Sequence, residues 1–299
     1  MTAPNPTPPI EGVRGGSSPP VGKSRRGEAP FGPPAGAGQR PAGSGQRPAY
    51  KLSGLLFVLF LLVLWEYLAR AGVLPAGAVP PASRVAAALW ELGASGEIFA
   101  EIGRTAGRAL AGFALGGLAG VLLGFGCGVF PGFGRAVGTT AEFLRPMPSV
   151  ALIPIGILFL GLGFGLCVAV AAFACCWPAY VAARAGAGAA GPELRDTARA
   201  YGLGRAESIV FVLAPAALPQ IFAGLRTGLA VAVAVAVTTE MAAAPNGLGS
   251  FILEASMAGR PERMYAGIVA VGALGAALNA LFLALRRRAL VWLPGTQRP

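Results

Sequence analysis

Long apolar segments dominate the sequence from residue 52 onward and leave few folds open to the chain. Residues 110–130, for example, read LAGFALGGLAGVLLGFGCGVF and contain no charged side chain. A helix needs about 20 such residues to cross the hydrocarbon core of a bilayer. Charged residues make up only 12% of the chain, about half of the ~25% share that is usual in soluble domains. The sequence therefore predicts an all-α membrane protein.

About six transmembrane helices can be placed along the chain. They cover approximately residues 52–69, 110–130, 135–163, 165–184, 221–241 and 264–285. The stretch 74–104 is semi-polar, with three prolines and three glutamates, and predicts a loop followed by an amphipathic helix at the membrane surface. The many glycines of the second span would let neighbouring helix backbones approach closely in lipid.

The distribution of basic residues predicts the orientation of these spans. Seven Lys or Arg residues lie at or before Lys51, and four lie in the last fifteen residues. With six spans both termini are on the same side, which the positive-inside rule makes the cytoplasm. We expect a multi-pass membrane protein, with both termini and the loop 185–219 cytoplasmic. Because its basic residues flank apolar segments, the net charge of +11 does not indicate a nucleic-acid partner.

Neither the polar ends of the chain nor its residue types indicate nucleotide binding, catalysis or metal binding. Residues 1–50 are rich in Pro, Gly, Ser and Arg and predict a disordered cytoplasmic tail; residues 293–299 predict a short second one. The tail contains Gly22-Lys23-Ser24, without the earlier glycine and preceding strand of a phosphate-binding loop. There is no histidine, and the four cysteines lie in apolar segments without metal-ligand spacing. We expect no catalytic residue, cofactor or metal in this chain, and no ATPase activity of its own.

A charged loop, residues 189–218, lies between the fourth and fifth spans. Pro192 and Glu193 suit the start of a short helix, and Gly202 or Gly204 would end it. A second short helix is expected from about residue 205 to 213, with a stop at Pro215. The residues alone allow two interpretations. The loop could dock a cytoplasmic partner, or it could be a solvated segment that only maintains the topology.

The spacing within this loop resembles a known motif. From Asp196 the sequence reads D-T-A-x-x-x-G, nine residues, then V-x-A-P. This is similar to the EAA loop of binding-protein-dependent ABC importer permeases, E-A-A-x-x-x-G, nine residues, I-x-L-P. Three positions match, Ala198, Gly202 and Pro215, and four are substituted, Asp196, Thr197, Val212 and Ala214. The flanking segments FLRPMPSVALIPIGILFLGLG and TTEMAAAPNGLGSFI extend the resemblance to roughly residues 52–292 and to the nitrate/sulfonate/taurine branch of these permeases.

The resemblance implies a MetI-like fold, typical of type I ABC importers, with a transmembrane permease domain over residues 51–292. Two permease subunits, expected as a homodimer in the lipid of the bacterial plasma membrane, would form the translocation pathway above two copies of an ABC ATPase subunit. An extracytoplasmic solute-binding protein would deliver the solute. The expected ATPase-coupling residues are Asp196, Thr197, Ala198, Arg199, Tyr201, Gly202, Arg205, Glu207, Val212 and Pro215.

The same resemblance implies a small anion as the solute, such as a sulfonate, nitrate or a taurine-like compound. A thiamine-precursor pyrimidine is the alternative within the family. A secondary transporter or channel that needs no ATPase is an alternative of another class. Such carriers more often contain duplicated halves and charged residues at mid-membrane, and we find no convincing repeat and no mid-span ion pair in this sequence.

Four residues are candidates for the pathway or its gate. Arg145, Pro146 and Pro148 interrupt the third span. The prolines could merely kink a helix, or they could create a break that lines the pathway, where Arg145 attracts an anion. Glu240 lies near the outer end of the fifth span. Intramembrane carboxylates are usually functional, but this one could also reach the interface or pair with an arginine.

Overall fold

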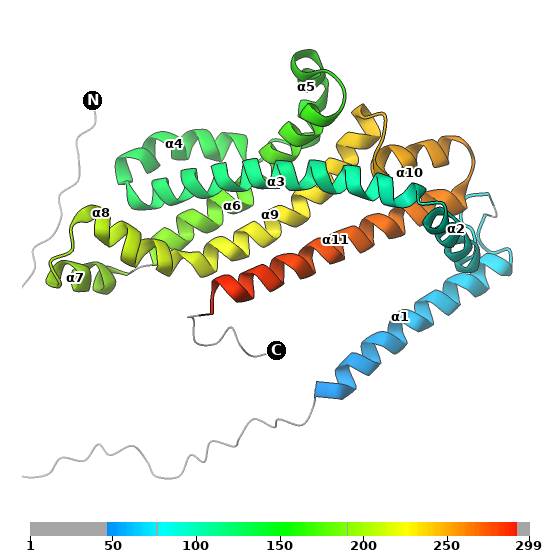
Figure 1. The fold of residues 1–299 in the computed structure, drawn as a ribbon, viewed down its shortest axis with the longest axis horizontal. Helices are drawn as coiled ribbons and strands as arrows, with labels where there is room; N and C mark the ends of the chain where they lie inside the picture. Colours follow the sequence, from blue (N-terminus) through cyan, green and yellow to red (C-terminus); the bar gives the residue numbers. More distant parts are fainter. Residues whose placement is uncertain (1–46, 76, 190, 292–299) are drawn as a thin grey trace, which may run out of the picture. The chain divides into compact units, whose positions relative to one another are not determined.

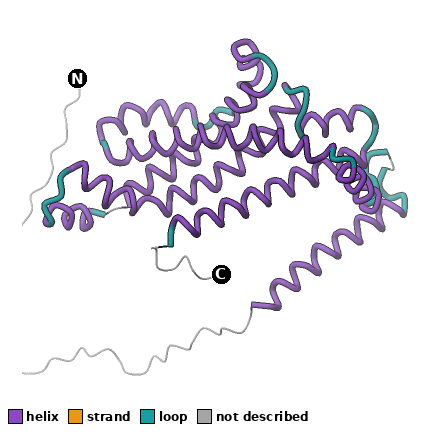
Figure 2. Tube along the Cα trace, in the orientation of Figure 1, coloured by secondary structure: helices purple, strands orange, loops and turns teal. Residues whose placement is uncertain are grey.

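The computed structural model describes residues 47–75, 77–189 and 191–291, and the regular elements in these ranges are helices (Figure 2). The disordered tail predicted for residues 1–50 lies outside the described residues up to residue 46, as does the tail 293–299. Residues 47–50 belong to helix α1, which spans Arg47–Arg70.

Four helices in the described ranges are long and apolar enough to cross a membrane. They are α3 (Glu97–Val129), α6 (Phe164–Ala189), a continuous helix over Arg205–Ala243 and α11 (Pro261–Ala289). Helix α4 (Pro131–Leu144) and the segment Ser149–Leu160 are long and apolar enough only together, as a bent pair that forms either one broken span or a re-entrant loop. The 24-residue apolar helix α1 occupies the place of the first predicted span. The all-α membrane architecture is confirmed, and these six segments follow the predicted order.

Helix α3 begins at Glu97, well before the predicted start near residue 110. The amphipathic helix predicted before it is α2 (Ala82–Ala94), which buries one apolar face. The first turns of α3 carry charged residues that appeared too polar for a span. The structure satisfies these charges with distant partners: Arg108 pairs with Glu240, and Glu101 accepts a hydrogen bond from the Gly247 amide.

Helices α3 and α6 pack with their backbones in near contact. Every fourth residue of α3 along this contact is a glycine, namely Gly112, Gly116, Gly120, Gly124 and Gly128. A Cβ atom added at Gly116 would lie 2.0 Å from the carbonyl oxygen of Ala172 in α6. One added at Gly120 would lie 2.2 Å from that of Cys176. The glycine pattern thus sets the distance between the two helices, as small residues do in lipid.

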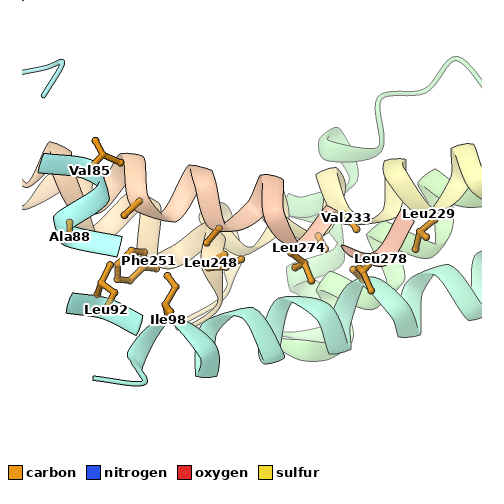
Figure 3. Close-up of a cluster of buried hydrophobic side chains, with 14 of the residues drawn as sticks. Val85, Ala88, Leu92, Ile98, Leu229, Val233, Leu248, Phe251, Leu274 and Leu278 are labelled. Atoms are coloured by element: carbon orange, nitrogen blue, oxygen red, sulfur yellow. The ribbon is translucent and has the colours of Figure 1, made fainter. Parts of the chain in front are cut away.

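Two sets of short helices lie at opposite ends of the bundle (Figure 1). Helices α7 (Pro192–Ala200) and α8 (Arg205–Ser208) are at one end, and α2 and α10 (Leu248–Met257) are at the other. Side chains of α2, α3, α9 (Ala214–Ala243), α10 and α11 form the main buried cluster (Figure 3). Helix α11 ends with three arginines, residues 286–288, and runs toward the end of the bundle that holds α7 and α8 (Figure 1).

The third predicted span is broken. Helix α4 ends at Leu144, and after Arg145–Pro148 a 3-10 turn (η1, Ser149–Leu152) leads into α5 (Ile153–Leu160). The two parts meet at 88°. Pro146 and Pro148 cause this break because proline lacks an N–H donor and disfavours helical geometry in the residue before it. The interruption was predicted from these residues, but its angle was not.

Candidate functional site

The charged loop forms a compact helix–turn–helix. Helix α7 ends at Ala200, and Gly202 adopts a left-handed conformation with φ of 74°. The amide of Gly202 donates to the Arg199 carbonyl at 2.9 Å, and that of Leu203 donates to the Ala198 carbonyl at 3.1 Å. These bonds close the end of α7. Of the two glycines predicted to end this helix, Gly202 makes the turn, because only glycine adopts this φ at low cost.

The second predicted breakpoint, Gly204, starts the next helix instead. Its φ is −63°, and its amide donates to Glu207 Oε2 at 2.8 Å. Glu207 therefore has a structural role at the beginning of α8 in addition to its predicted role in coupling. Its carboxylate also lies where the helix dipole favours negative charge.

Most of the predicted coupling residues share an exposed surface around this turn. Tyr201 is 82% exposed, and its neighbours in the set are exposed as well, namely Asp196, Thr197, Arg199, Gly202, Arg205 and Glu207. Ala198 is buried and anchors α7. Asp196 and Arg199 pair at 3.3 Å, but both side chains are mostly exposed, so the pair adds little stability. These polar groups are free to contact another protein.

The second helix of the loop does not stop at Pro215, as the sequence suggested. Helix α8 continues through a π-helical turn (η2, Ile209–Leu213) directly into α9. The prediction was wrong because Pro215 falls in the first turn of α9, where the wider preceding turn accommodates its ring and its missing N–H. Val212 and Pro215 are half-buried in this junction. The exposed turn is therefore joined rigidly to a spanning helix.

A large groove opens beside this spanning helix. Its volume is about 1030 Å³, and its walls come from the end of α4, the break after it, α6 and α9. Three of the predicted pathway residues, Arg145, Pro146 and Pro148, line it. Phe173 and Trp177 contribute an aromatic wall, with their rings edge to face at 5.5 Å.

Helix α9 exposes an unusual face along this groove. Apart from Met241 near its end, its exposed side chains are small or polar, and one face of the helix holds Gln220, Ala223, Arg226, Thr227, Ala230, Ala234 and Thr238. We call this set the open α9 face. Helices α3 and α5 instead expose large apolar side chains, such as Leu118, Leu122 and Leu158. Those surfaces suit lipid, whereas the open α9 face suits water or another protein.

The fourth predicted pathway residue, Glu240, does not line this groove. It is completely buried, at the far end of α9. Its carboxylate accepts hydrogen bonds from Arg108 Nη1 at 2.8 Å, from Thr105 Oγ1 at 2.8 Å and from the Gly249 amide at 3.1 Å. Three roles were open for Glu240: a pathway residue, a side chain that reaches the interface, or a partner of an arginine. The structure shows the pairing with an arginine, Arg108.

This buried network includes residues that the sequence did not single out. Arg108 also donates to the carbonyl oxygen and to the side-chain oxygen of Asn246, each at 2.6 Å. Thr105 Oγ1 accepts from the Leu248 amide at 2.8 Å. Glu101, Thr105 and Arg108 follow one another at helical spacing, a signal that indicates a shared polar face. The network ties the start of α3 to the end of α9 and the turn into α10.

Comparison with known proteins places this architecture in a family. The model of the binding-protein-dependent transport system inner membrane component family matches residues 116–291, more than half of the chain. An Escherichia coli (strain K12) protein named as an aliphatic sulfonates transport permease is 31% identical over 234 residues, 78% of this chain and 89% of its own length. The taurine transport system permease of the same organism is 31% identical over 151 residues, 50% of this chain and 55% of its own length.

A riboflavin transport system permease of Chloroflexus aurantiacus is 34% identical over 195 residues, 65% of this chain and 73% of its own length. Among solved structures, an amino acid ABC transporter chain superposes with a TM-score of 0.54 at 16% identity, covering 69% of this chain and 98% of that one. The fold is thus that of ABC importer permeases. The chain belongs to the binding-protein-dependent transport system inner membrane component family, and it resembles the sulfonate and taurine branch of that family.

Proposed function

We propose that the chain forms the translocation pathway of an ATP-driven importer and that α7 and α8 couple it to a separate ATPase subunit. The observation that carries this proposal is the continuity of the helix Arg205–Ala243. Its first turn belongs to the exposed docking surface, and its middle lines the groove. A displacement of α8 by a closing ATPase would therefore move the groove wall directly, as in rigid-body switching between two states.

The groove is open to one side in a single chain, which fits an importer built from two permeases. Two copies facing each other with their open α9 faces would enclose a pathway and remove these small, polar surfaces from lipid. Two ATPase copies would then contact the two exposed turns, and a solute-binding protein would dock at the end that holds α2 and α10. Helix α11 runs toward the α7–α8 end and finishes with three arginines, which supports a cytoplasmic position for that end.

The solute proposed is a small anion of the sulfonate class. Arg145 in the groove supports this choice, and so do the sulfonate and taurine relatives. The riboflavin relative makes a neutral ring compound the competing outcome. Uptake of labelled taurine or ethanesulfonate, with the cognate ATPase and binding protein present, decides between them. Exclusive uptake of a flavin or a pyrimidine would refute the anionic solute.

The isolated permease is expected not to hydrolyse ATP. A phosphate-binding loop is rich in glycine and follows a strand, and the described ranges contain no such strand and loop. The measurement is phosphate release by the purified chain in lipid nanodiscs, with the reassembled transporter as the positive control. Turnover that persists after the chain has been freed of every other subunit would contradict the subunit assignment.

Gly202→Val is expected to uncouple transport from ATP hydrolysis. A β-branched residue at this φ costs about 1–3 kcal/mol of backbone strain, and nothing lies within 4 Å of the position to compensate or clash. The two short helices would be misdirected relative to each other while the spanning helices keep their packing. ATP-driven uptake in proteoliposomes should fall by about tenfold or more, with normal membrane abundance of the permease.

The chain offers a matched control for this variant. Gly96, between α2 and α3, has φ of 78° and also has no atom within 4 Å of an added Cβ. Gly96→Val introduces the same strain at the opposite end, so it should leave ATPase binding intact. Gly202→Asn should retain much of the coupling, since asparagine tolerates left-handed geometry. If Gly202→Val binds the ATPase and transports like the parent, this loop is not the coupling element.

A further inference from the structure

Arg226 is a charged residue within a spanning helix. It lies 21 residues after the start of the continuous helix Arg205–Ala243 and 17 residues before its end, and it falls inside the fifth predicted span, 221–241. Arginines within transmembrane segments are rare, and they usually face the interior of a bundle or a water-filled cavity and not lipid. Its place therefore calls for a polar environment.

The structure orients the guanidinium of Arg226 toward the exposed side of the bundle. Its Nε donates to Asn279 Oδ1 of α11 at 2.9 Å. Both residues line a pocket of about 240 Å³ between α9 and α11. Leu229 and Val233 form the apolar base of this pocket and belong to the buried cluster (Figure 3). Among the described residues no other hydrogen bond to Arg226 is formed, so the four N–H groups at its tip remain available.

This pocket is continuous with the open α9 face. Ala230 and Ala234 line the pocket and also belong to that face. Thr227, the residue after Arg226, lines the groove, as do Gln220 and Ala223 before it. The small side chains at these positions leave room beside the guanidinium. In a pair of permeases that face each other across the open α9 faces, Arg226 would border the pathway.

The charges on this side of the bundle do not balance. The groove and the open α9 face together hold three described charged residues, Glu142, Arg145 and Arg226. Two positive charges and one negative charge leave one net positive charge per chain. A second copy of the chain would bring the same three residues and the same excess. The surface that would border the pathway therefore carries excess positive charge, which attracts anions.

We propose that Arg226, positioned by Asn279, binds the anionic group of the transported solute in the pathway. The chemistry indicated is an oxyanion such as a sulfonate, whose oxygens match the paired N–H groups of a guanidinium. Asn279 accepts a hydrogen bond from Nε of Arg226, so the N–H groups of the two terminal nitrogens stay free for this contact. The inference rests on the proposed role of the chain as an importer of small anions and adds the residue that selects for them.

The test uses the complete transporter, with its ATPase and binding protein, in proteoliposomes and labelled ethanesulfonate as the probe. Arg226→Gln should lower uptake by at least tenfold, while the amount of assembled complex and its ATP hydrolysis stay near the parent values. Arg226→Lys keeps the positive charge but lacks the paired N–H groups of a guanidinium, so its uptake should lie between that of Arg226→Gln and that of the parent. Arg287→Gln, which removes an exposed arginine at the end of α11, is the matched control and should transport normally.

Three outcomes would overturn the inference. Uptake by Arg226→Gln equal to that of the parent shows that no solute contact exists at this residue. A loss of uptake that only follows a loss of assembled complex, without recovery in Arg226→Lys, shows that the arginine serves packing. In both cases the parent still transports ethanesulfonate, and the proposed function stands. A parent that transports a neutral solute but neither ethanesulfonate nor taurine overturns the anionic solute and this site together.

Discussion

Glu240→Ala is expected to lower the free energy of unfolding of the permease by about 3–5 kcal/mol, the usual cost of leaving one member of a buried ion pair without its partner. The side chains of Arg108 and Glu240 are only 6% and 0% exposed. Without the carboxylate, Thr105 Oγ1 and the Gly249 amide would also lose their acceptor. The measurement is the thermal midpoint of the purified permease, which should fall by roughly 10 °C.

Two further variants define what this result means. Glu97→Ala removes a carboxylate that pairs with Arg263 at 2.6 Å in a largely exposed position, so it should cost less than about 1 kcal/mol. The double variant Arg108→Met with Glu240→Leu should lose less than the sum of its single variants, since no charge is then left buried. If Glu240→Ala were as stable as Glu97→Ala, the buried network around Glu240 would not stabilise the fold.

The features of the fold that depend on solvent were predictable from the sequence. Lipid demands long apolar segments, so the order of the long apolar helices could be read from composition. The turn at Gly202 was predictable because a left-handed residue after a short helix is nearly always glycine. The break at Pro146 and Pro148 was predictable for the same kind of local reason. In each case the relevant physics acts within a few residues.

The features that depend on tertiary contacts were not predictable in this way. Arg108 appeared too polar for a span because its partner Glu240 lies 132 residues away. Pro215 appeared to end a helix because the wider turn before it depends on how α8 joins α9. Arg226 went unnoticed because the sequence does not reveal which face of α9 the other helices leave exposed. Its neighbour Asn279 comes from a different helix.

Gly116→Ala is expected to disrupt the packing of α3 on α6, although it adds only one methyl group. The new Cβ would lie 2.0 Å from the Ala172 carbonyl oxygen and 2.6 Å from the Cys175 sulfur. The contact with the Ala172 carbonyl oxygen cannot be relieved by rotating a side chain, because that oxygen is a backbone atom. The helices would have to separate by more than about 1 Å to restore ordinary contact distances. Such a shift would weaken the contacts along the whole glycine stripe.

The expected cost is about 3 kcal/mol or more, at the upper end of what overpacking of a tight interface usually costs. Gly107→Ala provides the matched control in the same helix, since a Cβ there meets nothing within 4 Å. That change should be neutral or stabilising by up to about 1 kcal/mol, because alanine favours the helical state over glycine. Thermal unfolding of both purified variants beside the parent measures the difference. Equal midpoints for the two variants would mean that α3 and α6 do not approach as closely as these glycines allow.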